Sequence, residues 1–167
     1  EEYWDSEKSK KVSEEAYKPY EIKRTNCYNC PLSCLHYYEM ERDGEILSCE
    51  GMHANSVRGF ASNWDIDDPF YVLKIHSLCN KHGLDVDGVS ASVAWAIECF
   101  EEGIIDEKDT YGLKLKWGNA KDLVKLVEQI VYREGFGDIL AEGVYNASRI
   151  IGRDSYKYAM QIKGVNK

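Results

Sequence analysis

Three cysteines stand close together near the start of the chain, at the spacing C-x-x-C-x-x-x-C. They are Cys27, Cys30 and Cys34, in the stretch NCYNCPLSC, and the whole chain has only six cysteines. A loop this tight can direct several sulfur atoms at one centre, and its backbone N–H groups can stabilise thiolate charge. The spacing therefore predicts a site for a metal or a metal cluster.

Iron and zinc are the two candidates for this centre. A structural zinc site usually takes two separated pairs of ligands, and no second pair follows in this sequence. Three closely spaced thiolates with a distant fourth are typical of a cubane iron–sulfur cluster. We therefore expect a 4Fe–4S cluster. The alternative from another functional class is a zinc-stabilised helical interaction module, in which His36 or Cys49 completes the ligand set.

The composition narrows the classes of protein to consider. The chain has 167 residues, a formal net charge of −8 and 44% apolar residues, so it lacks the basic character of a nucleic-acid binder. Its apolar runs fall short of the ~20 residues that cross a bilayer, so no membrane partner is expected. Because the cysteines are too few for a disulfide scaffold, reduced thiols and a cytoplasmic location are expected.

The pattern of apolar residues predicts an all-α, multihelical fold, with a possible small hairpin at Asp43-Gly44 after the cysteines. We expect Cys79 and Cys99 on buried helix faces. The expected organisation is a lead-in with a short helix at 1–25, a cysteine-cluster segment at 26–62 and a helical domain at 63–167. Helices, each ending at a glycine, are expected at 69–82, about 87–102, 119–134 and 138–151.

Motifs beyond the cysteines suggest a relationship. They are, in order, CYNCPLSC, HSLCNKHGLDVDGVSASVAWAIECFEEG, LVEQIVYREGFGDILAEGVYNAS and YAMQIKG. In this order the sequence resembles the tungsten- or molybdenum-containing aldehyde ferredoxin oxidoreductases, over nearly the whole chain beyond about Thr25. The resemblance implies a fragment of a larger enzyme, comprising the first helical domain and the start of the next. Its partners would be the missing domains of the same enzyme.

The resemblance also implies cofactors and the residues that bind them. The three clustered cysteines would hold a 4Fe–4S cluster together with a fourth ligand beyond Lys167. A tungsten- or molybdenum-bis-pterin would contact the segment that corresponds here to Asn80, Gly83, Leu84 and Asp85. A carboxylate can accept two adjacent pterin N–H groups in parallel, and glycine lets the backbone approach closely. From the residues alone, the alternative is that Gly83 ends one helix while Asp85 or Asp87 caps the next.

The activity implied is oxidation of aldehydes, or reduction of acids, with ferredoxin or another electron carrier, in an enzyme expected to be a homo-oligomer. Aldehyde-oxidising members tend to have a Glu-rich stretch after the cysteines, whereas this chain reads CEGMHANS. This stretch keeps one acidic residue, Glu50, and adds His53, so these two are the candidate catalytic residues. This departure leaves open a subunit of the arenecarboxyl-CoA reductase type within the same family.

Overall fold

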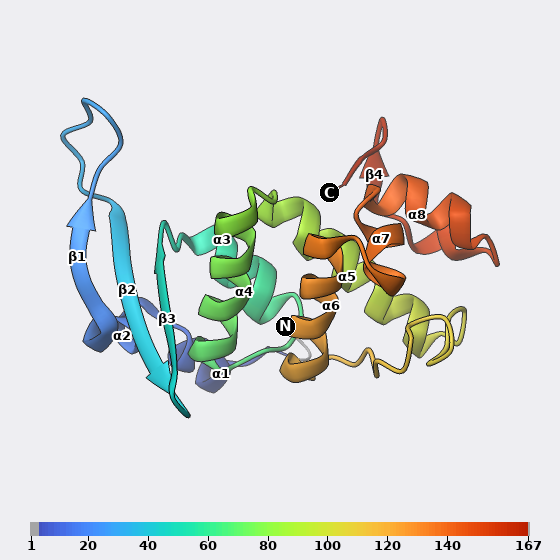
Figure 1. Ribbon diagram of the computed structural model, residues 1–167, viewed down its shortest axis with the longest axis horizontal. Coiled ribbons are helices and arrows are strands. Elements are labelled where there is room, and N and C mark those ends of the chain that lie inside the picture. The colour runs from blue at the N-terminus through green and yellow to red at the C-terminus, as the bar shows by residue number, and fades with distance from the viewer. Residues whose placement is uncertain (1–3, 167) are drawn as a thin grey trace.

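The structure, a computed structural model, describes residues 4–166, in which a group of helices packs beside a three-stranded sheet (Figure 1). The all-α expectation with a small hairpin is confirmed in outline, because helices form most of the molecule. The first half of the chain forms, in order, α1 (Ser6–Lys11), α2 (Glu14–Tyr17), η1 (Lys18–Tyr20), β1 (Glu21–Thr25), β2 (Leu35–Arg42), β3 (Glu45–Glu50), α3 (Ala54–Val57) and η2 (Arg58–Ser62).

The second half is helical until its last residues. It forms, in order, α4 (Pro69–His82), α5 (Val86–Glu101), α6 (Ala120–Tyr132), α7 (Gly135–Leu140), α8 (Gly143–Ile151), η3 (Ser155–Tyr158), β4 (Gln161–Ile162) and β5 (Val165–Asn166). The expected division at residues 25 and 62 stays a prediction, and its outermost residues, 1–3 and 167, lie outside the described part of the chain.

The larger sheet is antiparallel, in the order β1-β2-β3, and β4 and β5 form a separate two-stranded antiparallel sheet. The predicted hairpin is present: Arg42 pairs with Glu45, and Asp43 and Gly44 make the turn at positive φ, 52° and 81°. Strand β1 was not anticipated. Its three middle residues, Ile22, Lys23 and Arg24, are all exposed and only Ile22 is apolar, so the strand shows no alternating apolar pattern. It pairs along one edge of β2.

The ends of α4 follow the sequence signals. Asp68 Oδ1 accepts from the Phe70 N–H at 3.0 Å, Pro69 occupies the first turn, and Gly83 ends the helix in the left-handed conformation at φ 66°. The end of α6 differs from the prediction. This helix ends before Gly135, because Arg133 itself takes a left-handed conformation at φ 54°.

The single helix predicted at 138–151 is wrong. The chain forms two helices there, α7 and α8, which are separated at Gly143, where φ is 77°. A right-handed helix cannot continue through a residue at positive φ, so α8 starts in a new direction. Cys79 and Cys99 are buried, as expected, together with the apolar residues around them on the same helices, whereas Leu78, Phe100 and Val131 are only partly buried. The other buried positions on α5 and α6 include Val89, Val93, Ile97, Leu123, Leu126 and Ile130.

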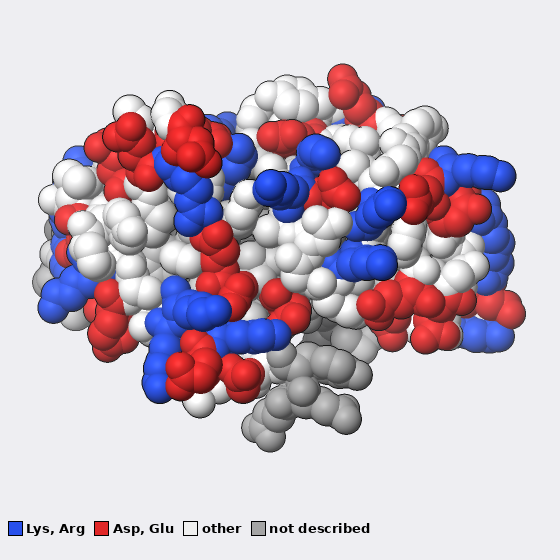
Figure 2. All heavy atoms as spheres, turned by 90° about the horizontal axis from the view of Figure 1, so that it is seen from below, with Lys and Arg blue, Asp and Glu red and all other residues white. Residues whose placement is uncertain are grey.

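The charged residues do not gather by sign on the face seen in Figure 2. Lysine and arginine side chains are interspersed with aspartate and glutamate there, and the coloured residues form no broad basic patch. Within residues 4–166, no helix is long and apolar enough to span a bilayer.

Candidate functional site

The three clustered cysteines lie in the loop at 26–34, which joins β1 to β2 and projects beyond the sheet (Figure 1). Cys27 and Cys34 are exposed and Cys30 is half-buried. The Cys30 N–H donates to the Cys27 carbonyl at 3.0 Å, and the Asn26 side chain donates to the Cys30 carbonyl. Asn29 takes a left-handed conformation, with φ 57°. The chain thus presents three accessible thiols on one short, internally bonded loop.

The donor set of this loop fits an iron–sulfur cluster by its chemistry, since it offers three soft sulfur ligands and leaves the fourth to another segment. Within the described residues, no three His, Cys, Asp or Glu side chains are already arranged to hold a metal ion. Of the two residues that could complete a zinc site, Cys49 is buried, and His36 Nδ1 lies 2.8 Å from Glu21 Oε2, a contact that leaves the other ring nitrogen for a ligand. The zinc alternative with His36 stays a prediction.

The remaining three cysteines differ in environment. Burial raises the pKa of Cys49 to about 11 and those of Cys79 and Cys99 to about 12. All three are therefore neutral thiols within the core at neutral pH. This contrast allows a simple test of which cysteines are available to a metal.

In cluster-free protein, iodoacetamide at pH 8 is expected to modify three of the six cysteines quickly, namely Cys27, Cys30 and Cys34. Access favours these three positions, and the raised pKa values of Cys49, Cys79 and Cys99 disfavour reaction at the buried ones. Peptide mass spectrometry identifies the modified sites, and the unfolded protein, in which all six should react, is the control. Fast labelling of Cys49 in folded protein would contradict the burial that separates it from the loop.

The expected pterin-contacting segment forms the turn between α4 and α5. The side chains of Asn80 and Asp85 are at the surface, and Gly83 ends α4. Asp85 Oδ2 accepts from the Gly88 N–H at 2.7 Å, which makes Asp85 the cap of α5. The capping alternative is thus what the structure shows, and a cofactor contact by Gly83, Leu84 or Asp85 stays a prediction.

Asn80 makes contacts within the chain, and its expected contact with the cofactor stays a prediction. Its Nδ2 donates to the Glu50 carbonyl at 2.7 Å, and also lies 3.3 Å from Cys49 Sγ and from His76 Nε2. The amide is directed at the end of β3. Asn80 therefore joins the end of α4 to the end of β3.

Sequence reasoning missed His76, which supports the same contact. Its Nε2 lies 3.2 Å from the Glu50 carbonyl, the side chain is 3% exposed, and its Nδ1 has no partner among the described residues. Burial lowers the pKa of His76, so the ring is neutral. The available signal was spacing, since His76 lies one helical turn before Asn80 on the same face.

The candidate catalytic residues Glu50 and His53 lie at this contact between β3 and α4 or just after it in the chain. Glu50 ends β3 with its side chain exposed, and His53 precedes α3 without a side-chain capping bond. In Figure 1 the cysteine loop, the end of β3 and the turn between α4 and α5 all lie toward the upper edge of the view. The catalytic roles of Glu50 and His53 stay predictions.

Comparison with known proteins decides the family. A family model described as aldehyde ferredoxin oxidoreductase, domains 2 & 3, matches residues 1–167. The chain belongs to the aldehyde ferredoxin oxidoreductase family. The resemblance seen in the cysteine spacing and the later motifs is confirmed.

Curated members of the aldehyde ferredoxin oxidoreductase family are considerably longer than this chain. A tungsten-containing aldehyde ferredoxin oxidoreductase of Pyrococcus furiosus is 34% identical over 134 residues, which cover 80% of this chain and 22% of that protein. The WOR-like subunit of an aliphatic sulfonate oxidoreductase from the same organism is 32% identical over 145 residues, covering 83% of this chain and 23% of that protein. The chain thus spans less than a quarter of the length of these relatives.

A solved structure shares the fold of this family member. The active-site complex BamBC of benzoyl coenzyme A reductase, determined in complex with 1,5-dienoyl-CoA, aligns with a TM-score of 0.80 and 28% identity. The alignment covers 98% of this chain and 24% of that one. The fold of this chain therefore matches about a quarter of that longer chain.

Proposed function

We propose that this chain is the part of a tungsten- or molybdenum-bis-pterin, iron–sulfur oxidoreductase that supplies three cluster thiolates and one cofactor-contacting turn. The observation that carries the proposal is the family match over residues 1–167, in a chain whose three accessible thiols share one loop. The fourth cluster ligand, the remaining domains and the electron carrier, ferredoxin or another, belong to the proposal as partners, as does a homo-oligomeric state.

The chain's own residues would have three tasks. Cys27, Cys30 and Cys34 would hold the cluster, and Asp85 would orient the pterin through the carboxylate oxygen that capping leaves available, since only Oδ2 accepts from Gly88. Glu50 or His53 would move a proton to or from the substrate. When bound, the metal–pterin and the cluster would supply two-electron redox chemistry and one-electron transfer to a carrier.

Aldehyde oxidation, or the reverse reduction of acids, is the proposed reaction, on the basis of the tungsten-containing relatives. The second candidate is a subunit of the arenecarboxyl-CoA reductase type, which the TM-score of 0.80 to the BamBC complex favours. Both candidates need the full-length enzyme.

The decisive experiment is anaerobic purification of the full-length protein, followed by metal analysis and two assays. Iron with tungsten or molybdenum, and a brown colour that a reductant bleaches, is the expected result; stoichiometric zinc alone would overturn the proposal in favour of an interaction module. Oxidation of an aldehyde with a viologen acceptor would support the first candidate reaction. Reduction of an aryl-CoA thioester would support the second.

Asp85→Asn in the full-length enzyme is expected to lower pterin content while leaving the free energy of unfolding within ~0.5 kcal/mol of the parent. Asparagine caps a helix as well as aspartate does, so the bond to Gly88 is kept. Loss of the charge weakens a charge-assisted contact worth about 1.5–3 kcal/mol, or roughly 10- to 150-fold in pterin affinity. Pterin released from the protein and oxidised is measured by its fluorescence, beside urea unfolding.

The matched control is Asp87→Asn, two residues further along, where the carboxylate lies 3.5 Å from Arg58 and makes no cap. This control is expected to retain its pterin. Unchanged pterin content in Asp85→Asn would leave Asp85 with the capping role alone.

A further inference from the structure

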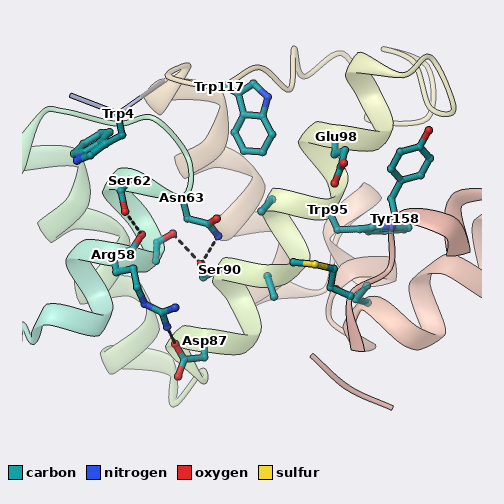
Figure 3. Close-up of a pocket in the computed structure, with 15 residues that line it drawn as sticks. Trp4, Arg58, Ser62, Asn63, Asp87, Ser90, Trp95, Glu98, Trp117 and Tyr158 are labelled. Atoms are coloured by element: carbon teal, nitrogen blue, oxygen red, sulfur yellow. Dashed lines mark hydrogen bonds and ion pairs between the residues drawn. The ribbon is translucent and has the colours of Figure 1, made fainter. Parts of the chain in front are cut away.

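A groove of about 790 Å³ runs along α5 and is lined by segments from both halves of the chain (Figure 3). Its volume falls in the range of about 300–1,000 Å³ that small-molecule sites occupy. The proposed redox function uses none of the residues that line it. The chemistry of the lining residues therefore has to indicate which ligand the groove could bind.

The floor of the groove is one face of α5. Asp87, Ala91, Ala94 and Glu98 line it at intervals of four, three and four residues, which places them on the same side of the helix. The alanines leave room above the helix. Asp87 has Arg58 as a neighbour at 3.5 Å, whereas the Glu98 carboxylate has no hydrogen-bond or ion-pair partner in residues 4–166.

Three aromatic rings line the groove at the Glu98 end, and a hydrogen bond holds each of them. Trp117 Nε1–H donates to Glu101 Oε2 at 2.7 Å, the Tyr158 hydroxyl donates to Glu102 Oε2 at 3.4 Å, and Trp95 Nε1–H donates to the Ser155 carbonyl at 3.1 Å. Their polar atoms are therefore satisfied. What the rings offer a ligand is their apolar and π surface.

Of the three carboxylates at this end of the groove, two are hydrogen-bonded to aromatic side chains and one is not. Glu101 and Glu102 follow Glu98 by three and four residues, so all three are neighbours on α5. Two of them hold Trp117 and Tyr158, and Figure 3 draws the third, Glu98, between these rings. Burial, and then the charges of Glu102 and Glu101, raise the pKa of Glu98, so a cation bound beside it would relieve the repulsion among these carboxylates.

We propose that this end of the groove binds a small organic cation, an alkylammonium group with a short apolar body. The positive group would lie beside Glu98 and against the Trp117 and Tyr158 rings, and the body would lie over Ala91 and Ala94. Aromatic rings attract such cations, and an open carboxylate adds direct charge complementarity. A metal ion does not fit, because it needs several oxygen ligands together and the described residues form no such group.

The test uses choline and its uncharged isostere 3,3-dimethylbutan-1-ol, titrated into the full-length enzyme by calorimetry. The two probes share shape and differ in charge. Saturable binding of choline with at least tenfold weaker binding of the isostere is the expected result. Equal binding of both probes, or binding of neither, would overturn the proposal, and the second result would mean that another segment of the enzyme covers the groove.

Two variants localise the site. Glu98→Gln removes the open carboxylate at nearly constant shape, and Trp117→Leu removes one ring; the ring is expected to contribute about 2- to 30-fold in affinity. Glu128→Gln on α6, which makes the same charge change outside the groove lining, is expected to bind choline as the parent does. Unchanged affinity in Glu98→Gln would overturn the proposal. None of these measurements depends on tungsten, molybdenum or turnover, so the cofactor proposal and this one fail separately.

Discussion

Cys30→Ser in the full-length protein is expected to abolish the visible absorption of the iron–sulfur cluster and to reduce bound iron to background. A serine hydroxyl is a poor substitute for a thiolate on iron, and the cluster then keeps only two ligands in this loop. The helices should remain, because Cys30 lies in a surface loop whose contacts are local. Absorption spectra, iron analysis and far-UV circular dichroism of anaerobically purified protein provide the three measurements.

Cys99→Ala is the matched control, since it removes a different sulfur atom from the same chain. Cys99 is 0% exposed on α5, so its loss should cost about 1–2 kcal/mol of stability through lost packing and leave the cluster in place. If Cys30→Ser protein kept a full complement of iron, the loop at 26–34 would not be the cluster site. This result would contradict the cluster assignment without contradicting the family assignment.

Gly137→Ala is expected to destabilise the protein by about 3 kcal/mol or more, the upper part of the range for overpacking a core. Gly137 is buried where α7 meets α6, and a Cβ there would lie 2.2 Å from the Gln129 carbonyl carbon and 2.3 Å from the Ile130 nitrogen. Both atoms belong to the backbone of α6 and cannot rotate away, so the helices would have to separate. Urea unfolding of the full-length protein measures the effect.

Gly103→Ala separates this steric effect from the ordinary cost of replacing glycine. Gly103 has φ 69°, and a Cβ at this position would meet no described atom within 4 Å beyond its neighbours in the chain. Gly103→Ala is therefore expected to lower the free energy of unfolding by only about 1–2 kcal/mol, the cost of placing alanine in the left-handed conformation. An equal loss in both variants would show that α7 can shift on α6 to accept the methyl group.

The sequence by itself determined the features that depend on neighbouring residues. The boundaries of α4 follow from Asp68, Pro69 and Gly83, and the hairpin turn follows from Asp43 and Gly44. Each depends on a cap or a turn conformation that a few consecutive residues settle. The cysteine spacing and the later motifs similarly indicated the family, which the match over the whole chain confirmed.

Only the tertiary structure decided which distant groups meet. Asn80 donates to the Glu50 carbonyl thirty residues earlier in the chain, a contact that no local pattern predicts. The break at Gly143 depends on how α7 and α8 pack, which helical periodicity does not report. The groove combines Glu98 with Trp117 and Tyr158, residues that no local pattern connects. Such contacts are set by the packing of whole elements, because side-chain partners far apart in sequence are chosen only when the helices and strands come together.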